Sequence, residues 1–437
     1  MAAIGANARA TFDSLSIRNY RCFFLGQMVS IIGNWMQVVA QAWLVLSITD
    51  SSAILGLTIT VQFLPTLLLG PYAGVVADRV DKRSIVIGTE SVALMCALVL
   101  GVLAVTGRAE LWMVLVLAAI LGTCSAFQAP ARQTFVLETV GPDKLTNAVG
   151  LMNTAMNVGR LLGPALAGAF ISLWGLPVCF FANVASFVIS ISAVLLVRRS
   201  DLRPTPRVPR AKGQLREGLR AVRADPALKV PLLMMLVVGT FTLEFIVTLP
   251  VMARDGFDVG AGGYGLMQSA MSIGAIGGGL YVANRVRPSH RWLVGAAFGL
   301  GLWTGVLALS PSYGMALVVL VPLGVGNVMF STLANATLQL AAAPEMRSRV
   351  MALFGVAWVG TTPIGGALLG WVAQVTHPRV ALGIGSIAAI GTALVAWPIL
   401  SRTRDPGTDA ADNEMMVPLT DDETLDEMVP RSDLRSP

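Results

Sequence analysis

Long apolar segments alternate with short charged ones along almost the whole chain. Twelve of the apolar segments can be delimited, and at about 20 or more residues each is long enough to cross a ~30 Å hydrocarbon core as a helix. Backbone groups inside lipid must be hydrogen-bonded within the chain, which excludes open strands. The predicted spans are residues 22–48, 52–77, 84–107, 111–131, 145–174, 176–197, 230–253, 259–283, 292–310, 312–343, 350–376 and 380–401.

A basic, proline-containing segment at 199–229 divides these spans into two sets of six. The sequence ADRV at 77–80 recurs as ANRV at 283–286, again between two apolar segments. This echo indicates two halves of common design, as in many secondary transporters. We therefore expect an all-α membrane protein of two pseudo-symmetric six-helix bundles. The expected parts are an N-terminal segment (1–20), two bundles (21–198 and 230–401) joined by the linker (199–229), and a disordered acidic tail (402–437).

The distribution of charge predicts which way the chain is inserted. Charged residues make up only 13% of the chain, against about 25% in soluble domains. Only Arg108, Arg254 and Arg379 fall in loops opposite the two ends of the chain, whereas almost all other basic residues lie on the same side as the ends. Loops rich in lysine and arginine stay in the cytoplasm, so both termini are expected there. The net charge of +6 then needs no nucleic-acid partner.

Several predicted spans carry a single polar stripe. In the first span the stripe consists of Gln27, Ser30, Asn34, Gln37 and Gln41, which share one helix face at ~100° per residue. Such side chains are costly to expose to lipid. They either bond to neighbouring helices or line a water-filled substrate cavity. The fifth and tenth spans add Asn153, Asn157, Arg160, Asn327 and Asn335 as candidate cavity residues.

Ionisable residues inside spans are candidates for function. Glu244 falls near the middle of the seventh span with no basic residue close in sequence, so it is a candidate for proton coupling or a hydrogen-bonded structural acid. Glu90 lies about two helical turns from a basic turn and is either a second coupling residue or one half of an ion pair with that turn. Arg160 is expected to pair with an acid on another helix or to contact substrate.

Two glycine-containing motifs have mechanical interpretations. The turn between the second and third spans contains a candidate gate made of Gly74, Asp78, Arg79, Lys82 and Arg83. The carboxylate of Asp78 is expected to accept hydrogen bonds from a helix N-terminus and from arginines, in one conformation only. In the fifth span, small residues permit close helix packing and a proline bends the helix. This packing motif comprises Gly159, Gly163, Pro164 and Gly168.

Enzymatic motifs are not found in the sequence. It has no phosphate-binding GxxxxGK[ST] loop, and its two histidines, His290 and His377, fall in different loops. The four cysteines lack CxxC spacing, so neither a metal nor a disulfide framework is expected. We expect no cofactor. The energy for transport is expected to come from an ion gradient or from the gradient of the substrate itself.

The two motifs resemble those of the major facilitator superfamily. The turn at 74–83 matches the superfamily's motif between spans two and three, with Asp81 where glycine is usual, and 159–168 matches a fifth-span motif of antiporters. Residues 127–168 are similar to the subgroup that contains the enterobactin exporter and macrolide efflux proteins. Many superfamily antiporters carry an arginine well inside span four, whereas Arg132 follows the predicted end of this span.

The resemblance implies a monomeric bacterial inner-membrane transporter that works by alternating access. Efflux of a small amphipathic molecule (a drug, antibiotic or siderophore) in exchange for protons is the function we expect. Uptake or lysophospholipid flipping on the same fold is the alternative. A membrane enzyme or receptor on a twelve-helix scaffold is a more remote one, since no catalytic cluster or large soluble domain is evident.

Overall fold

The computed structural model describes residues 12–203, 214–286, 288–343 and 346–403. Most of the N-terminal segment, the proline-rich part of the linker and the acidic tail from residue 404 lie outside these ranges. The side chain of Asp78 is also outside the description.

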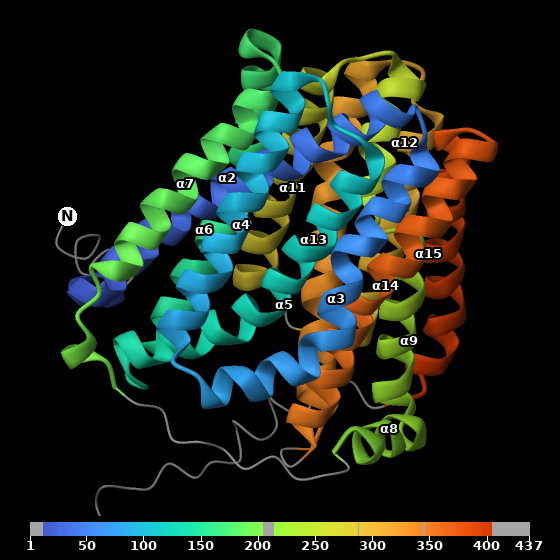
Figure 1. Cartoon of the computed structure of the whole chain (residues 1–437). Helices are drawn as coiled ribbons and strands as arrows, with labels where there is room; N and C mark the ends of the chain where they lie inside the picture. The colour runs from blue at the N-terminus through green and yellow to red at the C-terminus, as the bar shows by residue number, and fades with distance from the viewer. Residues whose placement is uncertain (1–11, 204–213, 287, 344–345, 404–437) are drawn as a thin grey trace, which may run out of the picture.

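Almost every described residue is helical (Figure 1). The first half follows the short helix η1 (Asp13–Ser16) and comprises α2 (Arg18–Thr49), α3 (Ser52–Arg79), α4 (Lys82–Thr106), α5 (Leu111–Val140), α6 (Leu145–Trp174) and α7 (Pro177–Leu195). The linker contains η2 (Arg199–Asp201) and α8 (Gln214–Ala224). The second half comprises α9 (Pro226–Phe241), α10 (Phe245–Val251), η3 (Met252–Gly256), α11 (Ala261–Arg285), α12 (His290–Leu309), α13 (Tyr313–Ala341), α14 (Arg347–Val375) and α15 (Pro378–Leu400).

Eleven helical segments in the described ranges are long and apolar enough to cross a membrane, with α9, α10 and η3 acting as one. The twelfth span of the arrangement is α11, which has 25 residues but is less apolar because seven of them are glycine. Several of these glycines permit close packing. A Cβ at Gly274 would overlap the carbonyl of Val321 in α13, and one at Gly265 would meet the carbonyl of Pro164 in α6.

The two halves repeat the same helix pairings. In the first half α3 packs on α5, α4 on α7 and α2 on α7; in the second half α11 packs on α13, α12 on α15 and α9 on α15. The halves meet along two seams, α3 against α14 and α6 against α11. The predicted fold of two pseudo-symmetric six-helix bundles is therefore confirmed.

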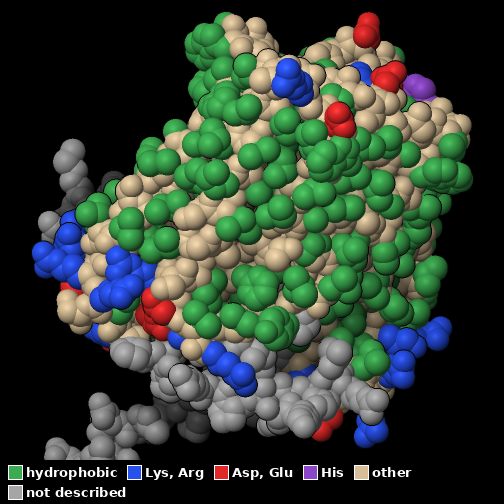
Figure 2. Space-filling view, in the orientation of Figure 1, with side chains coloured by type: hydrophobic (Ala, Val, Ile, Leu, Met, Phe, Trp, Pro, Cys, Tyr) green, Lys and Arg blue, Asp and Glu red, His purple; other side chains and the backbone are tan. Residues whose placement is uncertain are grey.

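The surface is divided by polarity in the way a membrane requires. Figure 2 shows a broad apolar band, with charged side chains gathered at its two ends. One end carries α8 and the described chain termini, and we call it the linker face; the other is the distal face (Figure 1). Basic side chains are prominent at the linker face, as the distribution of charge along the sequence predicts.

Candidate functional site

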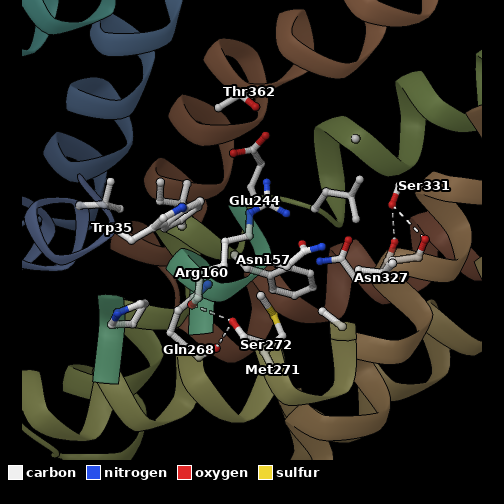
Figure 3. A pocket seen from close by; sticks show the side chains of 18 of the residues that line it. Trp35, Asn157, Arg160, Glu244, Gln268, Met271, Ser272, Asn327, Ser331 and Thr362 are labelled. Carbon is white, nitrogen blue, oxygen red and sulfur yellow. Dashed lines mark hydrogen bonds between the residues drawn. The ribbon is translucent and has the colours of Figure 1, made fainter. Parts of the chain in front are cut away.

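A cavity of about 220 Å³ lies between the bundles at mid-height. The first bundle contributes Trp35 from α2 and Asn157 and Arg160 from α6. The second contributes Glu244, from the break between α9 and α10, and Asn327 from α13. Figure 3 shows these side chains around one space. A carboxylate, a guanidinium, amides and an aromatic ring therefore meet where both bundles contribute.

A second cavity of about 320 Å³ adjoins the first and is lined mostly by the N-terminal bundle. The two share Trp35, Val38, Phe63 and Ile246 in their walls. Polar groups of this second space come from α2, α3 and α5, namely Asn34, Gln37, Gln41, Gln62, Gln128 and Arg132. Together the cavities offer an apolar middle with polar groups at both sides.

The structure divides the polar stripe of α2 between the two expected uses. Asn34, Gln37 and Gln41 line the second cavity, as a substrate passage requires. Gln37 also accepts a 2.7 Å hydrogen bond from Nδ2 of Asn183 in α7. Gln27 lines neither cavity and is buried in the bundle.

Only two of the other four asparagines predicted to line the substrate cavity do so. Asn157 and Asn327 line the central cavity. Asn153 and Asn335 do not line either cavity. Asn335 accepts a hydrogen bond from Nε2 of Gln339 one turn along the same helix.

Glu244 lies where the predicted seventh span is interrupted. The helix ends at Phe241 and resumes at Phe245, although no proline or glycine occupies the break. The hydroxyl of Thr242, in the break, donates to the carbonyl of Gly385 in α15 at 2.8 Å and so ties this segment to α15. Glu244 is almost fully buried, and its carboxylate points toward Thr362 of α14 (Figure 3). A broken helix at mid-membrane is typical of transporter binding sites.

Arg160 has no acidic partner within ion-pair distance among the described residues, so the expected ion pair is not formed. Its guanidinium instead lies 5.2 Å from the ring centroid of Trp35, within the range of a cation–π interaction. The remaining donors of the fork face the cavity (Figure 3). Arg160 is therefore placed for the other predicted role, contact with substrate.

Glu90 does not form the expected ion pair with the basic turn. Its Oε1 accepts hydrogen bonds from Gln27 Nε2 (2.7 Å), Ser190 Oγ (3.1 Å) and Gln128 Nε2 (3.1 Å). Arg132 is close enough to interact with it electrostatically. The partners come from three helices and join Glu90 to the wall of the second cavity through Gln128 and Arg132.

The position of Arg132 corrects the predicted end of the fourth span. We expected that span to stop at residue 131, but α5 continues to Val140. Pro130 does not end the helix, because a proline can be accommodated with one lost backbone hydrogen bond. Arg132 therefore lies inside α5 and lines a cavity. Sequence analysis missed it because the segment from 132 to 140 is more polar than the rest of the span.

The gate motif is anchored within its own bundle. Lys82 pairs with Glu138 of α5 at 3.3 Å, and Arg83 donates to the carbonyl of Leu195 at the end of α7 at 2.7 Å. The substituted position, Asp81, has φ −57°, so the turn does not require glycine there. Gly74 is buried in α3 and Arg79 is exposed at its end. The hydrogen bonds and ion pairs that the described side chains of this motif form therefore stay within the N-terminal bundle.

The packing motif of α6 serves both neighbours of that helix. A Cβ at Gly159 would overlap Ile31, and one at Gly163 would overlap Trp35, both in α2. Gly168 faces the other bundle, where a Cβ would lie 3.1 Å from the carbonyl of Gly262 in α11. Pro164 lines the central cavity.

Contacts that hold the bundles together at the distal face were missed by sequence analysis. Arg254 Nη1 bonds to the carbonyl of Leu46 at 3.1 Å and to Asp50 at 3.0 Å. Ser52 at the start of α3 donates through its backbone to Gln374 Oε1 at 2.7 Å. Nearer mid-membrane, Thr60 Oγ1 donates to the carbonyl of Pro363. Each pair is remote in sequence, so no local pattern marks it.

On the other seam, Ser272 of α11 likewise donates to the carbonyl of Arg160 in α6. Hydrogen bonds and an ion pair therefore join the bundles from the distal face to about mid-membrane.

Comparison with known proteins assigns this architecture to a family. A family profile described as "Transmembrane secretion effector" matches residues 9–432. The macrolide efflux protein A of Streptococcus pyogenes is 25% identical over 350 residues, covering 78% of this chain and 85% of that protein. The enterobactin exporter of Salmonella choleraesuis is 24% identical over 396 residues, covering 88% and 93%.

Solved structures share the fold at low sequence identity. A bacterial homologue of the iron transporter ferroportin, in an inward-facing state, aligns with a TM-score of 0.68 at 18% identity over 88% of this chain and 99% of that one. These relatives are transporters, which rules against the membrane enzyme or receptor. The chain is a multi-pass membrane transporter, and it belongs to the transmembrane secretion effector family of the major facilitator superfamily.

Proposed function

We propose that this transporter exports a small amphipathic molecule, such as a drug, an antibiotic or a siderophore, across the bacterial inner membrane in exchange for protons. The observation that carries the proposal is the central cavity lined by both bundles, in which Arg160, Glu244 and two asparagines surround aromatic side chains. Such a lining suits a molecule with polar and apolar parts. The named relatives that export macrolides and enterobactin support the direction.

The orientation follows from charge. The linker face carries the basic residues and faces the cytoplasm, so both termini are cytoplasmic. The contacts at the distal face then join the bundles toward the outside. One chain supplies both walls of the cavity, so a monomer suffices.

Glu244 is the residue we assign to proton coupling. It is the acid in the central cavity, and it lies on a broken helix that both neighbouring segments can reposition. A proton entering from outside neutralises the carboxylate, and a substrate entering from the cytoplasm replaces that proton. Glu90 is the second candidate, because its Oε2 has no hydrogen-bond partner among the described residues and leaves a position for a proton.

The proposal is tested with inverted membrane vesicles from a strain that lacks its own drug pumps. The compounds are ethidium, Hoechst 33342, a macrolide and a catecholate siderophore, each with and without an imposed pH gradient. We expect gradient-driven accumulation of at least one compound, and a loss of more than about ten-fold in Glu244→Gln because the neutral amide cannot exchange a proton. The control is Glu110→Gln, which changes an exposed acid outside the cavities.

Two outcomes would contradict this assignment. Accumulation only by right-side-out vesicles would indicate uptake, and movement of lysophospholipid alone would indicate flipping. If Glu244→Gln kept the pH dependence of the unmodified protein, coupling would have to be sought at Glu90.

A further inference from the structure

A groove of about 420 Å³ lies on the outer surface of the N-terminal bundle, between α4 and α5. Its lining includes Gly88, Thr89 and Val92 of α4 and Ile120, Thr123 and Phe127 of α5. The groove is apolar despite its two threonines, because Thr89 and Thr123 donate their hydroxyls to carbonyls of their own helices. The exposed fractions of Val92 and Ile120 are 44% and 37%, and at this height in the bilayer both side chains face lipid.

Only a thin layer of side chains separates this groove from the second cavity. Cys124 of α5 lines both spaces. Beside it, Ala93 and Leu121 line the cavity side, and Gln128 follows one turn away. The layer is therefore made of two small side chains and one leucine, whereas Gln128 and Arg132 provide polar groups behind it.

We propose that the seam between α4 and α5 is a lateral entrance, through which an amphipathic substrate dissolved in the bilayer passes Cys124 and reaches the cavity. This inference rests on the proposed export of amphipathic molecules and adds the route of entry. The groove can hold the apolar part of such a molecule, because this part exchanges one apolar environment, the lipid, for another. The amides and guanidinium behind the seam then receive its polar part, which lipid solvates poorly.

The occupant is the substrate and not a resident lipid. The groove and the second cavity share a wall residue, so a molecule in the groove is one side chain away from the transport path. A phospholipid whose acyl chain only rests in the groove would not need this continuity.

The first test labels Cys124 and needs no transport. In a variant whose other three cysteines are replaced (Cys22→Ser, Cys96→Ala, Cys179→Ala), a bilayer-soluble reagent, pyrenyl maleimide, should reach Cys124 from the groove. Gly88→Trp should slow this labelling at least ten-fold by filling the groove. A Cβ at Gly88 meets no atom within 4 Å, so a side chain can begin there without overlapping a neighbour. The control is Gly295→Trp in α12, whose glycine is equally exposed and equally open.

The second test measures transport. For Hoechst 33342, which dissolves in lipid, Gly88→Trp should raise KM at least five-fold with an unchanged maximal rate, whereas Gly295→Trp should leave both unchanged. Unchanged labelling of Cys124 in Gly88→Trp would overturn the entrance. Slower labelling with an unchanged KM would also overturn it, because that is the result expected if the groove holds a resident lipid. If the unmodified protein transported none of the compounds in the vesicle test, the proposed function would be overturned instead. Labelling of Cys124 would still decide whether the seam is open.

Discussion

Glu90 shows how much of a buried polar site one residue can reveal. An acid inside an apolar span indicates a site by itself, because its burial is costly without partners. Its partners, Gln27, Gln128 and Ser190, come from three other helices. Gln27 was recognised as part of a polar stripe, but its direction toward Glu90 depends on helix rotation and tertiary packing. The residue types were therefore predictable and their pairing was not.

Replacing Glu90 separates a structural role from a coupling role. Glu90→Leu leaves three donors without their shared acceptor, two of them buried (Gln27 and Ser190), at a cost of about 1–3 kcal/mol for each buried unpaired group. We expect the apparent Tm in detergent to fall by several degrees. Glu90→Gln keeps an acceptor oxygen and should leave Tm nearly unchanged. A normal Tm for Glu90→Leu would show that this hydrogen-bond centre does not stabilise the bundle.

At the scale of elements, all twelve spans were predicted from apolar length, but their ends and interruptions were less accessible. The fourth span extends past its predicted end because residues 132–140 are held by neighbouring helices and the linker; Glu138, for example, pairs with Lys82. The seventh span breaks at 242–244 without a local breaker residue, and the Thr242 hydroxyl within the break donates to a carbonyl of α15. Such features depend on tertiary partners, which hydropathy does not encode.

The close packing of α6 against α2 gives a sharp test at this scale. Gly163→Leu would force a side chain into Trp35 and the carbonyl of Ile32. Overpacking of this kind costs about 1–3 kcal/mol or more, so we expect a lower yield of folded protein and a lower Tm. Gly150→Leu in the same helix is the control, because a Cβ there meets no atom within 4 Å. Equal stability of the two variants would contradict the packing role of the motif.

At the scale of the whole molecule, the structure is one conformation of two bundles that meet at the distal face. The repeat and the polar stripes indicated a doubled bundle around a passage. The contacts that close one end could not be predicted, since Arg254 lies in η3 and Asp50 in the connection between α2 and α3, in different bundles. These contacts are few and partly exposed. Asp50 is 93% exposed, so the ion pair contributes about 1 kcal/mol or less, as a gate that must reopen requires.

The most direct test of two rocking bundles is a pair of distance measurements by double electron–electron resonance. One spin-label pair, at Glu110 and Pro311, spans the bundles at the distal face; another, at Asp143 and Arg402, spans them at the linker face, and all four positions are exposed. We expect a second population with a longer distal and a shorter linker-face distance. Arg254→Gln should increase its share by up to about five-fold, whereas Arg108→Gln should not. If both distances stayed single and unchanged with pH, with transported compound and in Arg254→Gln, alternating access about this cavity would be contradicted.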